Sequence, residues 1–210
     1  MLNTIFKATL AILLLLLCRS CAIPQMHTSY ANDKKYMAMA SGKWLLNNIN
    51  TNPAVSGKIK SKMESLSKNT LQKNLGNRFT FIDDARGKIL LPDTGIMELD
   101  AKDLQILNAT TGFNYLIDIS AETVTMNQGI DKLTGYPPNN TEMRIFIRIY
   151  DLQNQTMVHS QLTRAYTDQM GQRLYEPNEK LFMITLKKAL KNLRKNSDLY
   201  TKPRLCEASI

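Results

Sequence analysis

Two acidic pairs and one histidine are the side chains whose types and spacing could support acid–base chemistry. Asp83 and Asp84 adjoin in the stretch FTFIDDAR, Asp118 precedes Glu122 by four residues, and His159 lies in a run of strand-forming residues. Such groups catalyse hydrolysis only when a nucleophile or a metal ion lies within reach of the base. Acidic residues at a strand end commonly support a turn instead, and we expect His159 to be a packed or surface side chain. The pattern therefore favours a protein that is not an enzyme.

Metal and cofactor sites have no support in the residue pattern. The two histidines, His27 and His159, are far apart in the sequence, and no pair of cysteines has the CxxC spacing of a zinc site. Gly129 and Gly135 are not followed by the GK[ST] of a phosphate-binding loop. We predict neither a cofactor nor a metal.

The most specific chemical signal is a cysteine that follows an apolar run, in AILLLLLCRSCAIPQ. Lys7 precedes the run and Arg19 follows it, which is the arrangement of a secretory signal peptide. The run from Ala8 to Leu17 has only about half of the roughly 20 apolar residues that a membrane-spanning helix needs. Residues 1–20 are therefore predicted to be a signal peptide that the mature protein lacks.

The end of this run resembles the lipobox of bacterial lipoproteins, in which a small residue precedes the cysteine that is acylated. Cys21 and the serine before it fit best, although Arg19 and Cys18 depart from the pattern, and Cys18 is the alternative acceptor. The resemblance implies a lipid on Cys21 with acyl chains such as palmitate, and stable anchoring requires more than one chain. Ala22 and Ile23 are not the aspartate that retains some lipoproteins at the inner membrane, which implies an outer-membrane lipoprotein facing the periplasm. The alternative is simple secretion with Cys21 unmodified.

The rest of the composition is typical of one exported globular domain. About 190 residues remain after the signal peptide, and Cys206 then has no partner for a disulfide. The formal net charge is +9, or +7 without Lys7 and Arg19. Lysines gather on the segments 58–73 and 187–195, which we interpret as solvated helix faces, the alternative being attraction to an anionic surface. No recognition motif for nucleic acid accompanies the charge.

Hydrophobic patterns predict the order strand, helix, strand, helix, three strands, helix. The strands are predicted at 43–49, 78–84, 113–125, 144–151 and 156–166, and the helices at 57–74, at 100–112 with Asp100 as its cap, and from about Pro177. This order predicts an α/β (α+β) fold, with a single mixed sheet, an antiparallel hairpin in the C-terminal half and about three packed helices. Residues 21–41 are predicted to be the lipidated N-terminus and a flexible tether, 42–198 the domain and 199–210 a C-terminal tail.

Three sequence segments within these predicted elements resemble a known group of proteins. FTFIDDAR, TGFNYLIDIS and IFIRIYDLQNQTMVHS are similar to phrases of the bacterial envelope lipoprotein superfamily that includes the N-terminal domain of TolB, CsgG and LpoB. The resemblance covers residues 43–196. Members are mostly binding or assembly modules, so it implies a membrane-anchored, non-enzymatic lipoprotein that binds a protein of a cell-envelope machine.

Two further functions are alternatives to this prediction. An oligomeric, CsgG-like secretion component would need amphipathic membrane hairpins with strands of about 9–11 residues, and neither 119–141 nor 167–177 suits them. A secreted glycoprotein would use the acceptor triplets at Asn108, Asn139 and Asn154.

A row of arginines and aromatic residues is the candidate partner-binding site. Arg144, Phe146, Arg148 and Tyr150 alternate with isoleucines and therefore share one face of the predicted strand. Arginine and aromatic side chains are frequent anchors at protein interfaces. The alternative is that Phe146 and Tyr150 cover a second core under a helix.

Overall fold

The computed structural model describes residues 25–30, 41–85, 98–127, 139–167 and 179–197. The predicted signal peptide, Cys21 and the predicted C-terminal tail lie outside these residues.

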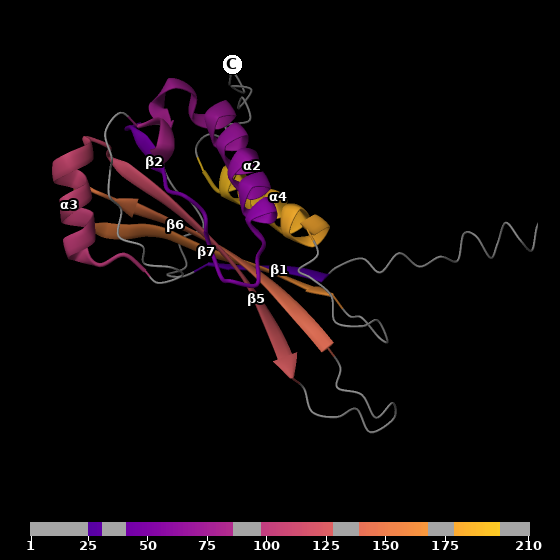
Figure 1. The fold of residues 1–210 in the computed structure, drawn as a ribbon. Helices are drawn as coiled ribbons and strands as arrows, with labels where there is room; N and C mark the ends of the chain where they lie inside the picture. The colour runs from indigo at the N-terminus through magenta and orange to yellow at the C-terminus, as the bar shows by residue number, and fades with distance from the viewer. Residues whose placement is uncertain (1–24, 31–40, 86–97, 128–138, 168–178, 198–210) are drawn as a thin grey trace, which may run out of the picture.

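The described residues form one mixed sheet of seven strands packed against three α-helices, which confirms the predicted fold class (Figure 1). The strands are β1 (Gln25–Tyr30), β2 (Trp44–Leu46), β3 (Asn50–Thr51), β4 (Phe79–Phe81), β5 (Tyr115–Asn127), β6 (Asn139–Asp151) and β7 (Thr156–Thr167). The α-helices are α2 (Gly57–Leu75), α3 (Ala101–Thr111) and α4 (Glu179–Lys195), and the short 3-10 helices η2 (Gly76–Arg78) and η3 (Ile82–Asp84) flank β4.

The strands lie in the order β1-β7-β6-β5-β2-β4, and β3 pairs with β5. Along the order β1, β7, β6, β5 each strand runs antiparallel to its neighbour, whereas β2 and β3 run parallel to β5, and β4 runs parallel to β2. The chain moves outward from β2 to β4 through α2 and then back across β2 to β5 through α3. Because parallel crossovers are right-handed, these opposite moves place α2 and α3 on opposite faces of the sheet.

Local signals fix the ends of α2 and α3, and the sequence predicts those at Asp100, Gly76 and Gly112 but not the cap at Ser56. The Ser56 hydroxyl accepts a hydrogen bond from the Ile59 N–H at the start of α2. Asp100 and Asp103 form a reciprocal capping box at the start of α3. Gly76 and Gly112 end the two helices with φ of 59° and 65°, a backbone region that glycine enters without steric cost.

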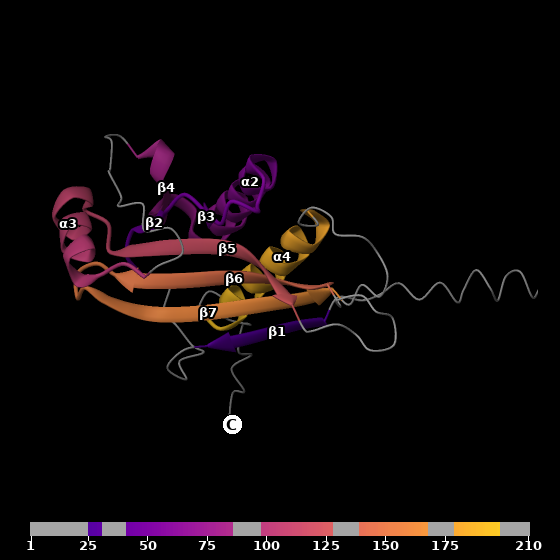
Figure 2. The same cartoon turned by 60° about the horizontal axis from the view of Figure 1, so that its bottom comes forward.

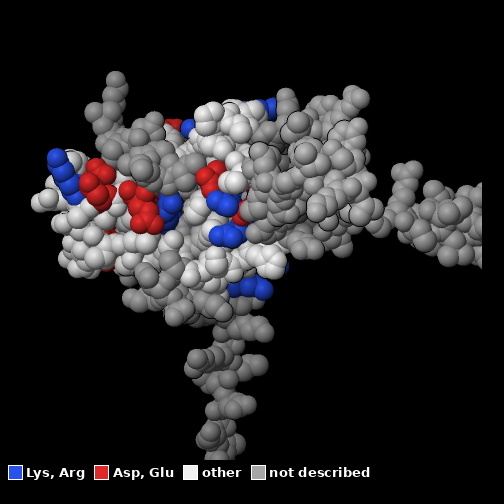
Figure 3. Space-filling model, turned by 90° about the horizontal axis from the view of Figure 1, so that it is seen from below, with Lys and Arg blue, Asp and Glu red and all other residues white. Residues whose placement is uncertain are grey.

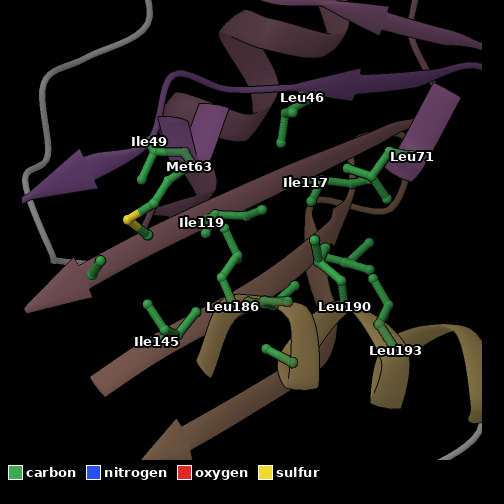
Figure 4. Packing of buried hydrophobic residues seen from close by; sticks show 14 of the residues in the cluster. Leu46, Ile49, Met63, Leu71, Ile117, Ile119, Ile145, Leu186, Leu190 and Leu193 are labelled. Atoms are coloured by element: carbon green, nitrogen blue, oxygen red, sulfur yellow. The ribbon is translucent and has the colours of Figure 1, made fainter. Parts of the chain in front are cut away.

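Most of the hydrophobic core lies between the sheet and the helices α2 and α4, and a smaller part of the same cluster includes Leu104 and Leu107 of α3 together with Tyr150. Figure 4 shows Met63 and Leu71 of α2 and Leu186, Leu190 and Leu193 of α4 gathered with the isoleucines of the central strands. Alternate residues of β6 point into this layer, and Ile145, Ile147 and Ile149 are fully buried there. The core face of α4 consists of residues that are all buried: Phe182, Leu186, Ala189, Leu190 and Leu193.

The prediction of a flexible tether is wrong for residues 25–30, which form the edge strand β1 along β7. Hydrophobic patterning missed this strand because it is polar and is held by its backbone and by side chains of α4. Asn192 Nδ2 donates to Thr28 Oγ1 at 2.9 Å, and Asn196 Nδ2 donates to the Tyr30 hydroxyl at 2.7 Å.

Two other strand boundaries differ from the prediction. The single strand predicted at 43–49 is divided into β2 and the two-residue β3, and β4 is shorter than the predicted 78–84. Strand β6 begins at Asn139, five residues before the predicted start, because the polar residues there pair through their backbones with the end of β5. Hydropathy does not report such pairing.

Candidate functional site

The sheet face opposite α2 and α4 carries most of the ordered charge pairs in the described part of the chain. Acidic and basic side chains lie intermixed on this side of the molecule (Figure 3). Cross-strand register explains the mixture, since Asp118 of β5 lies opposite Arg148 of β6, and Glu122 lies opposite Arg144. We call the group Glu122, Glu142, Arg144, Phe146 and Arg164 the ionic face.

Arg144 is the centre of the ionic face. Its Nε and Nη2 atoms donate to the two carboxylate oxygens of Glu142 at 2.9 and 3.1 Å, and Nη1 donates to Glu122 at 3.2 Å. Arg164 of β7 completes an ion pair with Glu142 at 3.4 Å. The hydrogen bond to Glu142 is the main cause that raises the pKa of Arg144 above its usual value. Paired charges from β5, β6 and β7 are thus held in one fixed array.

A second charge pair lies deeper, toward α3. Asp118 is 2% exposed and accepts hydrogen bonds from Asn47 Nδ2 at 3.2 Å and from Arg148 Nη1 at 3.4 Å. Burial raises the pKa of the Asp118 carboxyl above its usual value, and the bonds from Asn47 and Arg148 oppose part of that rise. Arg148 Nη1 also donates to Ser120 Oγ at 3.3 Å. This pair is a structural element inside the protein, because almost none of it reaches the surface.

The structure places the four residues of the predicted partner-binding row on one face of β6, at different depths. Tyr150 is 1% exposed beneath α3, and its hydroxyl accepts a hydrogen bond from the Leu99 N–H at 3.2 Å. Burial raises the pKa of Tyr150 to about 12. Phe146 is half-buried, and the Arg148 guanidinium carbon lies 5.1 Å from the centre of its ring. Arg144 and Phe146 are therefore the members of the row that reach solvent.

The structure does not bring the candidate acid–base residues together. Asp83 and Asp84 are exposed on η3, where Asp84 pairs with Lys68. His159 lies on the opposite sheet face, edge-on to the ring of Tyr30 with centroids 6.0 Å apart. Asp118 and Glu122 each pair with a different arginine. Within the described residues, no group of three or more His, Cys, Asp or Glu side chains has the geometry to hold a metal ion.

Sequence reasoning missed Glu142 and Arg164 as members of the ionic face. Glu142 lies two residues before Arg144, so strand alternation puts both on one face, but this required β6 to start earlier than predicted. Arg164 is brought beside them by the register of β6 and β7, which the turn between those strands sets.

The helices that the structure describes give no candidate for a transmembrane span, since none combines sufficient length with sufficient hydropathy.

Comparisons with known proteins find distant structural likenesses only. No protein-family model and no curated protein sequence matches the chain. A PelC dodecamer structure from Paraburkholderia phytofirmans aligns at 13% identity and a TM-score of 0.44, covering 81% of this chain and 96% of that one. The lipoprotein GNA1162 of Neisseria meningitidis aligns at 12% identity and a TM-score of 0.42, covering 74% and 99%.

The C-terminal domain of LpoB from Escherichia coli also aligns, at 15% identity and a TM-score of 0.34, covering 63% of this chain and 88% of that one. The matched structures thus include bacterial lipoproteins. At these TM-scores the likeness assigns no function, and the resemblance to the TolB, CsgG and LpoB superfamily stays a prediction from the sequence.

Proposed function

We propose that the protein is a lipid-anchored module of the bacterial cell envelope that binds a protein partner through the ionic face and performs no catalysis. The anchor is Cys21, acylated after removal of residues 1–20, and the membrane is the outer membrane with the domain facing the periplasm. Support for the anchor comes from the sequence, in which the apolar run ends at a cysteine preceded by a small residue.

The observation that carries the binding role is the geometry of Arg144 and Phe146. The side chain of Arg144 is 26% exposed, yet three hydrogen bonds to Glu142 and Glu122 hold its guanidinium in place. Phe146 lies two residues along the same strand and is partly exposed beside it. A preorganised arginine next to an aromatic ring loses little side-chain entropy on binding, which is the property of an interface anchor.

Arg148 and Tyr150, the two buried residues of the predicted partner-binding row, stabilise the strand that carries Arg144 and Phe146. Arg148 contacts the Phe146 ring and is itself fixed by Asp118, while the Tyr150 hydroxyl accepts the N–H of Leu99, the residue before the N-cap of α3. Their part in partner binding is to position Phe146 and Arg144. Of the acidic groups considered above as catalysts, Asp84, Asp118 and Glu122 form ion pairs in the fold, and Asp83 accepts a hydrogen bond from Asn48.

The proposal is tested by crosslinking the tagged protein in its native cells and determining the mass and composition of what co-purifies. A stoichiometric envelope protein supports the proposal, whereas a large ring of this chain alone supports a secretion component instead. Recovery of an unacylated monomer from the soluble fraction contradicts both the anchor and the partner.

The site is tested by Arg144→Ala and Phe146→Ala in the same experiment. Either change is expected to reduce recovery of the partner at least about tenfold, as for an interface anchor worth 1.4 kcal/mol or more. The matched control is Arg194→Ala, which removes an exposed arginine from α4 on the opposite side of the sheet. Equal loss with the control variant would show that net charge, not the ionic face, decides binding.

A further inference from the structure

The position of β1 limits how far the folded domain can lie from the proposed lipid anchor. Gln25 begins the strand, only four residues after Cys21. A fully extended chain spans at most about 3.6 Å per residue, so the two Cα atoms are separated by at most about 14 Å. The anchor therefore constrains the orientation of the domain, which a long tether would not do.

Strand β1 is attached firmly enough to transmit this constraint. All six of its residues pair with β7, from Gln25 opposite Tyr166 to Tyr30 opposite Gln161. Thr28 and Tyr30 are also hydrogen-bonded to Asn192 and Asn196 of α4. The anchored residue is thus connected to both the sheet and the helix layer within a few residues.

The start of β1 defines one end of the molecule. The register continues across the sheet from Gln25 to Tyr166, from Tyr166 to Glu142 and from Glu142 to Val124, so these four residues form a row. Figure 2 shows this end on the right, where β1 starts and β5 ends, and α3 at the opposite end. We call the end that carries this row the anchor end.

The helices α2 and α4 both begin toward the anchor end. The chain enters α2 from β3, which pairs with Ser120 and Ala121, and the ion pair between Lys62 and Glu179 joins the first two turns of α2 to the first turn of α4. These turns are rich in lysine relative to acidic residues. The charged residues in them are Lys58, Lys60, Lys62, Glu64, Glu179 and Lys180.

We infer that the protein docks its anchor end on a membrane surface with anionic headgroups, so that α3 points away from the bilayer while the ionic face, whose Glu142 belongs to the anchor-end row, begins close to the headgroups. This inference rests on the proposed function, because it takes Cys21 as the acylated residue. The surface that the anchor end contacts is the lipid bilayer, because the short connection from the acylated cysteine keeps this end of the domain next to the membrane. Excess lysine on the first turns of α2 and α4 attracts anionic headgroups toward the same end.

The orientation is testable with two matched cysteine probes. Ala54 is exposed just before α2 near the anchor end, and Ala109 is exposed on α3 at the opposite end. Ala54→Cys and Ala109→Cys are each made in the full lipidated chain with Cys206→Ser and labelled with a donor fluorophore. The protein is then reconstituted into vesicles of phosphatidylethanolamine and phosphatidylglycerol that contain an acceptor-labelled lipid headgroup.

Energy transfer to the headgroups is expected to be at least about twofold more efficient from position 54 than from position 109, since the sheet separates them by on the order of 20 Å. A flexible insertion of about 20 glycine and serine residues between Cys21 and Gln25 is expected to remove most of this difference. Equal or reversed efficiencies in the chain without the insertion would overturn the inference.

A separate readout distinguishes this failure from failure of the proposed function. The mass of the N-terminal peptide of the same preparation reports whether Cys21 is acylated. If Cys21 is acylated but energy transfer from position 54 is no more efficient than from position 109, the orientation alone is contradicted. An unmodified N-terminus contradicts the anchor and, with it, the orientation.

Discussion

The two faces of the central sheet are built from the same strands by different physical means. On the face toward α2 and α4, residues such as Ile145 and Ile147 are fully buried among leucines. On the opposite face, Arg144, Phe146 and Arg148 of the same strand enter ion pairs and a cation–π contact. Burial of apolar surface is non-directional and supplies most of the stability, whereas charge pairs require fixed geometry and add little net stability. The first face therefore holds the fold together, and the second is suited to recognition.

The largest expected contrast is between two phenylalanines, one for each face. Phe182 of α4 is fully buried, and Phe182→Ala is expected to lower the free energy of unfolding by about 3–5 kcal/mol through lost burial and a cavity. Phe146 is half-buried on the ionic face, so Phe146→Ala is expected to cost less than about 1.5 kcal/mol. Urea unfolding of both variants measures the contrast. Equal losses would show that the ionic face is a second core.

The next effect concerns the buried pair of Asp118 and Arg148. Arg148→Met is expected to cost about 3 kcal/mol, because it leaves the Asp118 carboxylate buried without its counter-charge. Adding Asp118→Leu is expected to restore most of that loss, since no charge then remains unpaired. Unfolding free energies at neutral pH for the two single variants and the double variant complete the cycle. Simple addition of the two losses would mean that the residues do not act as a pair.

A smaller effect appears at alkaline pH through Tyr150. Its pKa is raised from 10.0 to about 12 in the folded state, so the folded protein holds the phenol proton more tightly than the unfolded chain does. The associated stability is fully present below pH 10 and is lost as the pH rises to about 12, by roughly 2–3 kcal/mol.

Tyr150→Phe isolates this contribution from other groups that titrate at high pH. The variant is expected to lose about 1 kcal/mol at neutral pH, because the Leu99 N–H loses its acceptor. It is also expected to lose less additional stability than the parent chain between pH 10 and 12. Parallel alkaline slopes in the two proteins, measured by urea unfolding at each pH, would contradict the assignment.

The smallest effect is expected at the start of α3, the α-helix on the side of the ionic face. Asp100→Ala removes the side chain that caps the Asp103 N–H and is expected to cost about 1 kcal/mol. Ser56→Ala at the start of α2 is the matched variant on the other face, with a weaker cap at 3.4 Å. Thermal unfolding compares the two, and a larger loss for Ser56→Ala would reverse the expected order.

The contrast between the faces was only partly predictable. Alternation in β6 placed the isoleucines on one face and Arg144, Phe146, Arg148 and Tyr150 on the other, because strand side chains alternate with period two. Alternation could not say that Tyr150 would be buried under α3 while Arg144 reached solvent. That depended on the path of the crossover to α3, which no local pattern contains.

The sequence by itself determined the three helices, the Asp100 cap of α3, the glycine ends of α2 and α3, the C-terminal hairpin and the mixed α+β class, because these depend on interactions between residues near one another in the chain. Only the tertiary structure decided that residues 25–30 join the sheet and that Asp118 meets Arg148, thirty residues away. The physical reason is that strand register and helix packing select partners at long sequence separation. A polar edge strand such as β1 is stabilised by backbone and asparagine hydrogen bonds, and hydropathy does not record these.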